Sequence, residues 1–165
     1  DGSDSHGSPL ASPTHWDVRL VVAVVSDQKK PISSRKAMQY TARTSPFFSA
    51  WCDTAQVDLD IAKKAVLERD MKTLGEQMEH STFKMFSTMF SAKPAIRFWK
   101  PQTLKIQELV EELRRNGTPC WATMDAGPNV KILCSADDAE KIVASIQDHC
   151  LATHILSAGS DAKLL

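Results

Sequence analysis

Nucleotide-binding loops are missing from this sequence. Its 165 residues include six glycines, and none of these forms a G-x-x-x-x-G-K-S/T or G-x-G-x-x-G pattern. Glycine-rich loops of this kind hold phosphate groups with backbone N–H groups at the start of a helix. The chain by itself therefore offers no visible means of holding a nucleotide.

An excess of one charge and a long apolar run are also lacking. Lys plus Arg and Asp plus Glu number 20 each, so the net charge does not favour nucleic-acid or membrane binding. The longest strongly apolar run, Leu20–Val25, is far shorter than the roughly 20 residues that span a bilayer. No signal peptide is visible. We expect a soluble, cytoplasmic protein that binds neither nucleic acid nor membrane.

The cysteines and histidines lack the spacing of metal ligands. Four cysteines contain no C-x-x-C pair, and five histidines contain no H-x-x-x-H pair. The sequence thus argues against a metal held by this chain. It favours reduced, mostly buried thiols, and the cysteines concerned are Cys52, Cys120, Cys134 and Cys150.

Hydrophobic periodicity predicts an α+β fold in which helices cover a mostly antiparallel sheet. Apolar residues on both faces of the strand at 17–25 are typical of a central strand covered on both sides. The remaining elements are expected as helices at 34–44, 46–69, 71–90, 103–115 and 137–148, a hairpin at 120–135 and a strand at 151–156.

Residues 1–14 are rich in Ser, Gly, Pro and Asp and are expected to form a loop or linker. This leaves 15–165 as the folded domain, and a chain that opens in a linker is expected to be part of something longer.

Two of the predicted helices carry apolar stripes. In the helix at 46–69, Val57, Ile61 and Ala65 fall on one stripe. The helix at 71–90 carries a stripe rich in methionine. An apolar ligand groove is one interpretation of that second stripe, and core packing is the commoner one. Its members are Met71, Leu74, Met78, Met85 and Met89.

A carboxylate is predicted at the tip of the hairpin. Asp125 stands in the sequence Asp-Ala-Gly-Pro-Asn between two β-prone runs, and these residue types form tight turns. A rigid tip of this kind can hold a catalytic base. Alternatively, Asp125 only stabilises the turn, and turn chemistry leaves both interpretations open.

A cationic segment precedes the helix at 34–44. The run Lys29–Arg35 places two lysines, two serines and an arginine where a strand feeds a helix. Helix N-termini attract anions, so Ser34 and Arg35 are candidates for binding a phosphate or a carboxylate. The alternative is N-capping by Ser33 or Ser34 beside solvated basic side chains.

The hairpin tip also carries a resemblance to a known family. Met124–Val130 closely matches the carboxyl-terminal motif of the mevalonate diphosphate decarboxylase family, a branch of the GHMP kinase superfamily. Asp1–Ser5 resembles that family's D-G-x-D-S segment. Ser34-Arg35 falls where bacterial-type members carry S-R, and Thr44–Pro46 resembles their T-S motif. The resemblance covers the chain from Asp1 to about residue 147.

The resemblance implies a fold, a reaction and several partners. Family members have two lobes, and this chain resembles the second, the ferredoxin-like C-terminal domain of GHMP kinases. ATP and Mg²⁺ are then held mainly by the N-terminal lobe. The family phosphorylates the 3-hydroxyl of mevalonate 5-diphosphate, and loss of phosphate and CO₂ yields isopentenyl diphosphate. Family members are often homodimers, so a homodimer is a further expectation.

The same resemblance assigns site residues. Asp125 is implied as the catalytic carboxylate that orients or deprotonates the 3-hydroxyl. Ser34 and Arg35 are implied as ligands of the substrate's anionic groups, and the N–H of Ala126 as a hydrogen-bond donor to the substrate.

Three departures from the family pattern leave alternatives open. Phe86 replaces the usual His of the F/M-H-A-T segment, Lys93-Pro94 replaces a P-P pair, and Ser3 replaces a lysine. The substrate is therefore either the diphosphate or the monophosphate. A related GHMP small-molecule kinase without decarboxylation is one alternative function, and a non-catalytic binding module of the same fold is another.

Overall fold

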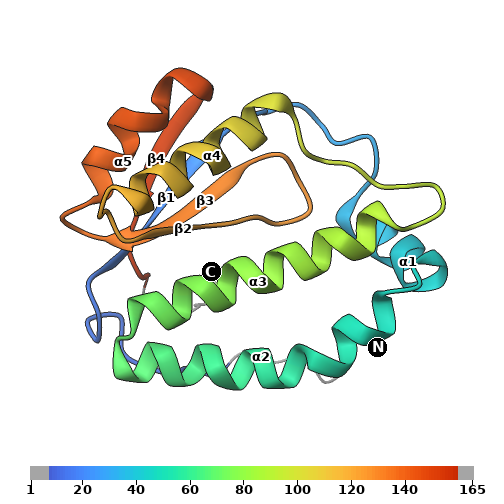
Figure 1. The fold of residues 1–165 in the computed structure, drawn as a ribbon, viewed down its shortest axis with the longest axis horizontal. Coiled ribbons are helices and arrows are strands. Elements are labelled where there is room, and N and C mark those ends of the chain that lie inside the picture. The colour runs from blue at the N-terminus through green and yellow to red at the C-terminus, as the bar shows by residue number, and fades with distance from the viewer. Residues whose placement is uncertain (1–7, 160–165) are drawn as a thin grey trace, which may run out of the picture.

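The structure is a computed structural model that describes residues 8–159 (Figure 1). The Asp1–Ser5 segment lies outside these residues, and residues 8–14 form irregular turns. None of the described helices is long and apolar enough to cross a membrane. In chain order the elements are β1 (Val18–Val24), α1 (Ser34–Thr44), α2 (Phe48–Glu68), α3 (Met71–Phe90), α4 (Pro101–Arg115), β2 (Cys120–Thr123), β3 (Val130–Ser135), α5 (Ala139–Ile146), a 3₁₀ turn (Gln147–His149) and β4 (Ala152–Leu156).

The sheet confirms the α+β prediction. Its four strands run in the order β2-β3-β1-β4, and every neighbouring pair is antiparallel. β1 is a central strand, as its apolar composition predicts. Lys131 of β3 lies opposite Val22 of β1 on one side and Thr123 of β2 on the other. Directly opposed residues share a face of a sheet, so these three side chains lie in one row.

One face of the sheet is fully covered. Val21 and Ala23 of β1 and Ile132 of β3 are completely buried there, in the same core as Ile106 of α4 and Ile142 of α5. Figure 1 shows α4 and α5 lying together over this part of the sheet. Both helices are predicted by the sequence, and their apolar positions pack against this core.

The second face is covered over β2 but only in part over β1. Helix α3 approaches β2 so closely that a Cβ added at Gly75 would stand 2.1 Å from Cδ2 of Trp121. Leu20, Val22 and Val24 of β1, which alternate with the buried residues, are only half-buried. Within the described residues the predicted cover of this strand is therefore complete on one face and partial on the other.

Helix α2 also differs from its prediction. It lies at the outside of the molecule and packs mainly against α3 (Figure 1). A helix with one main neighbour buries only a narrow strip. Ala65 is accordingly buried, whereas Val57 is 60% and Ile61 39% exposed. The helix also begins at Phe48 rather than at Pro46, because Ser45 accepts hydrogen bonds from Phe47 N and Phe48 N in a preceding turn.

The methionine-rich stripe of α3 lies partly in the core and partly along a cavity. Met89 is fully buried in the core. Leu74, Met78 and Met85 are half-buried and line a cavity of about 420 Å³ between α2, α3 and the end of β2. Core packing therefore accounts for Met89 and in part for Met85, which packs against the same core.

Candidate active site

The predicted hairpin tip lies between β2 and β3 and is tied to two other parts of the chain. Oδ1 of Asn129 accepts hydrogen bonds from Val25 N (2.9 Å) and Ser26 N (3.0 Å), just after β1. Oγ1 of Thr103, in the first turn of α4, donates to the carbonyl oxygen of Pro128 (2.8 Å). These bonds satisfy buried backbone groups and fix the tip against the body of the domain.

Asp125 presents its carboxylate at this tip. The side chain is 82% exposed and forms an ion pair with Nζ of Lys131, whose side chain is only 29% exposed. The neighbouring Ala126 is buried, and N–H of Gly127 donates to the carbonyl oxygen of Asp125 (2.7 Å). The carboxylate is thus accessible to a ligand while the backbone beneath it is fixed.

The start of α1 lies beside the tip. Ser33 is the N-cap, because its Oγ accepts a hydrogen bond from Lys36 N (3.3 Å). Ser34 is therefore the first helical residue, and its hydroxyl is not used for capping. Arg35 is exposed and forms no ion pair within the described residues.

A lysine that the sequence did not single out joins the two regions. Nζ of Lys30 donates to the carbonyl oxygen of Ala126 (2.7 Å) and to Oγ of Ser34 (2.8 Å). Both Lys30 and Lys131 line a cavity of about 250 Å³ with Asp125 and Ala126. Lys131 lies opposite Val22, so the two side chains share a face of the sheet. The alternation of side chains along β3 is the sequence signal that would have indicated the position of Lys131.

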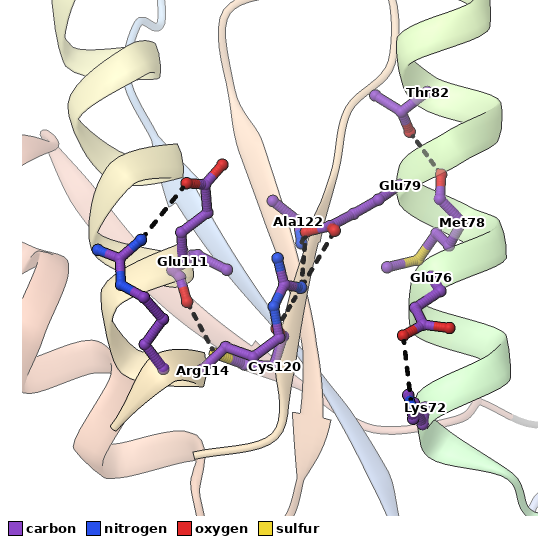
Figure 2. A network of polar contacts seen from close by, with 11 residues as sticks. Lys72, Glu76, Met78, Glu79, Thr82, Glu111, Arg114, Cys120 and Ala122 are labelled. Atoms are coloured by element: carbon purple, nitrogen blue, oxygen red, sulfur yellow. Dashed lines mark hydrogen bonds and ion pairs between the residues drawn. The ribbon is translucent and has the colours of Figure 1, made fainter. Parts of the chain in front are cut away.

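The strand that leads into Asp125 is held from two helices (Figure 2). Glu79 of α3 accepts a hydrogen bond from Ala122 N (2.9 Å) and pairs with Arg114 of α4 (3.0 Å). Arg114 also donates to the carbonyl oxygen of Cys120 (3.0 Å). β2 is an edge strand, so these side chains satisfy backbone groups that face away from the sheet. The position of the tip therefore depends on α3 and α4 as well.

Phe86 and the buried cysteines lie in the hydrophobic core and do not form part of the tip. Phe86, which replaces the family's His, is 1% exposed and stacks in the core with Trp99 at a centroid distance of 5.0 Å. Burial raises the pKa of Cys120 to about 12 and that of Cys134 to about 11, so neither thiol acts as a nucleophile at neutral pH. The prediction of mostly buried thiols holds for these two, whereas Cys52 is exposed.

Metal-ligand chemistry is not provided by the described residues. Between residues 8 and 159 no group of three or more His, Cys, Asp or Glu side chains is close enough to share a metal ion. The carboxylate at the tip is already paired with an ammonium group. A divalent cation at this site would need ligands from elsewhere.

These features define an antiparallel α+β domain with an accessible carboxylate on an anchored hairpin tip. The model of the mevalonate 5-diphosphate decarboxylase C-terminal domain matches residues 20–162. The chain therefore belongs to the mevalonate 5-diphosphate decarboxylase family, in which it corresponds to the C-terminal domain.

Curated relatives agree with this assignment. The diphosphomevalonate decarboxylase of Candida albicans is 28% identical over 151 residues, which cover 90% of this chain and 42% of that protein. The human enzyme of the same name is 27% identical over 151 residues, which cover 88% of this chain and 38% of that protein. The chain thus spans about two fifths of the length of these relatives.

Solved structures show the same fold. The mevalonate diphosphate decarboxylase of Staphylococcus aureus has a TM-score of 0.81 and 32% identity, covering 92% of this chain and 48% of that one. The enzyme of Enterococcus faecalis, described for mevalonate diphosphate-mediated ATP binding, has a TM-score of 0.82 and 29% identity, covering 94% and 47%. A third structure, with a TM-score of 0.82 and 32% identity over 88% and 45%, is a complex with mevalonate diphosphate, AMPPCP and magnesium.

Proposed function

We propose that this chain supplies the carboxylate-bearing half of the active site of an ATP-dependent diphosphomevalonate decarboxylase. The reaction converts mevalonate 5-diphosphate and ATP to isopentenyl diphosphate, CO₂, ADP and phosphate. The observation that carries the proposal is the exposed Asp125 carboxylate on an anchored tip, inside a sequence that matches the family from residue 20 to residue 162.

Asp125 is assigned as the carboxylate that orients or deprotonates the 3-hydroxyl group of the substrate. A base must approach that hydroxyl to within about 2.6–3.2 Å, and an exposed carboxylate on a fixed backbone permits such an approach. The tertiary carbon develops positive charge as phosphate departs, and a neighbouring carboxylate stabilises that charge. Accepting the proton requires an ionised Asp125, and the carboxyl group must release that proton to solvent before it can stabilise the positive charge on the neighbouring carbon.

We assign the start of α1 as the binding site for the anionic end of the substrate. Ser34 is at the first position of the helix, where unpaired N–H groups and the helix dipole favour an anion. Arg35 is exposed beside it, and a guanidinium binds phosphate in bidentate fashion. Ala126 N–H is assigned as a donor to the substrate next to the carboxylate.

ATP and Mg²⁺ are assigned to another part of the enzyme. The sequence has no glycine-rich phosphate loop, and the described residues have no cluster of metal ligands. The residues that the structure describes do not fit either group, so we assign both to an N-terminal lobe of the GHMP kinase type. The face of β1 that carries Leu20, Val22 and Val24 is only half-buried, and we assign it as a surface against which that lobe packs. We also propose a cytoplasmic homodimer, as for other family members.

The test is the release of CO₂ by the full-length protein that contains this chain. With carboxyl-labelled mevalonate 5-diphosphate and ATP, we expect equal amounts of CO₂ and ADP, and a lower rate with the monophosphate. Asp125→Asn should lower kcat by roughly 10²–10⁴-fold, the usual contribution of a general base.

Asp137→Asn is the matched control, because Asp137 is an exposed aspartate in the turn after β3. It should leave kcat unchanged. A stable 3-phosphorylated product without CO₂ would show a kinase instead of a decarboxylase. Full turnover by Asp125→Asn would exclude Asp125 as the base.

A further inference from the structure

The cavity of about 420 Å³ that α2, α3 and the end of β2 enclose has no role in the proposed reaction. Figure 1 shows α3 lying between α2 and β2. The residues that line this cavity are all different from those that line the cavity beside Asp125. Ligand sites in proteins are mostly apolar cavities of about 300–1,000 Å³ with a few fixed polar groups. The cavity between α2 and α3 has the size of such a site.

The walls of this cavity are apolar and adaptable. Leu74, Met78 and Met85 line it from α3, and all three side chains are half-buried. Trp51 lines it from α2. Methionine side chains adjust their shape to a bound molecule, and an indole ring supplies a large and rigid contact area. These walls therefore suit a ligand with an apolar body.

The charge at the cavity wall is already balanced. Asp58 is the one ionisable residue among the described residues that line the cavity. It forms an ion pair with Lys84, and the two side chains are 15% and 21% exposed. A charged ligand would have to leave water without finding a free counter-ion here, which is costly. The cavity therefore favours a neutral ligand.

One polar group of the wall lacks a partner. Nε2 of Gln77 is buried and has no hydrogen-bond partner of normal geometry in the part of the chain that the structure describes. The amide lies near Asp58, because Gln77 adds to the effect of Lys84, which chiefly holds the pKa of Asp58 below its usual value. A buried N–H group without an acceptor is rare, since it loses its bonds to water and gains nothing in return. An acceptor oxygen on a bound molecule would satisfy this group.

We propose that this cavity binds a neutral, largely apolar molecule with one hydrogen-bond acceptor, of the class of aliphatic alcohols and ketones. The apolar body lies against Trp51 and the side chains of α3, and the oxygen accepts a hydrogen bond from Nε2 of Gln77. Such a molecule also contacts Met124, the residue directly before Asp125. The inference goes beyond the proposed function and does not depend on it.

The test is the binding of 1-octanol to the full-length protein that contains this chain, measured by isothermal titration calorimetry. We expect one saturable site with a Kd of about 1 mM or below. Octanoate and octylammonium carry a charged head on a similar chain and should bind at least roughly tenfold more weakly, since neither charge finds a free partner in the cavity. Hydrogen exchange at the amides of Thr123 and Met124 should slow when octanol is bound.

Two variants locate the bound octanol. Gln77→Leu removes the donor and should weaken binding by about fivefold, the usual contribution of one hydrogen bond. It should also raise the Tm of the protein without octanol, because it removes a buried unpaired group. Ala55→Phe fills the cavity from an exposed position on α2 and should weaken binding by more than about tenfold through steric overlap.

Gln56→Leu and Gln56→Phe are the matched controls. Gln56 is exposed on α2, next to Ala55, and does not line the cavity. Both control variants should bind octanol as the wild type does. Thermal unfolding checks that each variant is folded. If Ala55→Phe does not fold, the comparison of Gln77→Leu with Gln56→Leu decides the outcome.

Three results would overturn the inference. One is the absence of saturable octanol binding to the full-length protein. Another is wild-type affinity in folded Gln77→Leu or folded Ala55→Phe, which would mean that octanol binds elsewhere. The third is tighter binding of octanoate or octylammonium than of octanol. Failure of the proposed function is distinct from these results, because it shows as absence of CO₂ release or as an active Asp125→Asn protein.

Discussion

Replacement of Glu79 by alanine should destabilise the domain more than its position on a helix surface suggests. Glu79 accepts the hydrogen bond of Ala122 N at 2.9 Å and pairs with Arg114 at 3.0 Å. Removal leaves the half-buried N–H of Ala122 without this acceptor, which costs about 1–3 kcal/mol.

Loss of the ion pair adds to this cost. The side chains of Arg114 and Glu79 are 30% and 18% exposed, so the pair belongs at the upper end of the range for surface pairs, about 1 kcal/mol. Together we expect the free energy of unfolding to fall by about 2–4 kcal/mol in Glu79→Ala. Glu79→Gln keeps an oxygen acceptor for Ala122 and should lose only about half of that.

The assay is equilibrium unfolding in urea, followed by tryptophan fluorescence. Trp121 reports on this region directly, because the guanidinium carbon of Arg114 lies 5.6 Å from the centroid of its ring. Glu76→Ala is the control. Glu76 lies on the same helix, its side chain is 59% exposed, and it stands 3.9 Å from Lys72 (Figure 2).

The control should change the free energy of unfolding by less than about 0.5 kcal/mol. Hydrogen exchange at the amide of Ala122 should also accelerate in Glu79→Ala and not in Glu76→Ala. Equal stabilities of the two alanine variants, within about 0.5 kcal/mol, would refute the assignment of Glu79 as the anchor of β2.

Two further predictions concern titrating groups. The hydrogen bond from Lys84 holds the pKa of Asp58 below its usual value, so this stabilisation is complete above the unfolded pKa of about 3.9 and is lost as pH falls through the folded pKa. The urea midpoint should therefore decline more steeply below pH 4 in the wild type than in Asp58→Asn, and identical slopes would contradict this. A thiol reagent at pH 8 should modify Cys52 within minutes and leave Cys120 and Cys134 unmodified until the protein unfolds, since burial raises the pKa of both; rapid labelling of either one in folded protein would be the contrary result.

Local sequence patterns predicted most of the elements. The apolar residues on both faces of β1 identified that strand, and the turn residues between β2 and β3 identified the hairpin. Gly117, two residues after the end of α4, adopts a φ of 89°, which is common for a glycine that follows a helix. These features depend on residues close together in the chain, and short-range rules describe them well.

The outer surface of α2 was predicted less well. Periodicity shows that Val57 and Ile61 share a stripe with Ala65, but it does not show how many neighbours a helix has. Because α2 packs mainly against α3, only part of that stripe is covered, and the two larger side chains remain exposed. The tertiary arrangement around α2 therefore determines which residues of the stripe are buried.

Within the candidate site, sequence reasoning supplied Asp125, Ala126, Ser34 and Arg35 as candidates, and their roles remain proposals. The contact made by Lys30 was not foreseeable, since its two partners lie 4 and 96 residues away. In the sequence Lys30 was one of several cations in a loop. Only the packed structure distinguishes it from the exposed Lys29 beside it.

The side chains that bond to β2 also restrict how this sheet can grow. The outward-facing N–H of Ala122 and carbonyl of Cys120 already form hydrogen bonds with Glu79 and Arg114. These two groups are therefore not available to pair with a strand from another molecule. At the opposite border, β4 carries no comparable side-chain bond within residues 152–156, and Ile155 and Leu156 are exposed there. Any continuous sheet formed with a second polypeptide would therefore extend past β4, in one direction only.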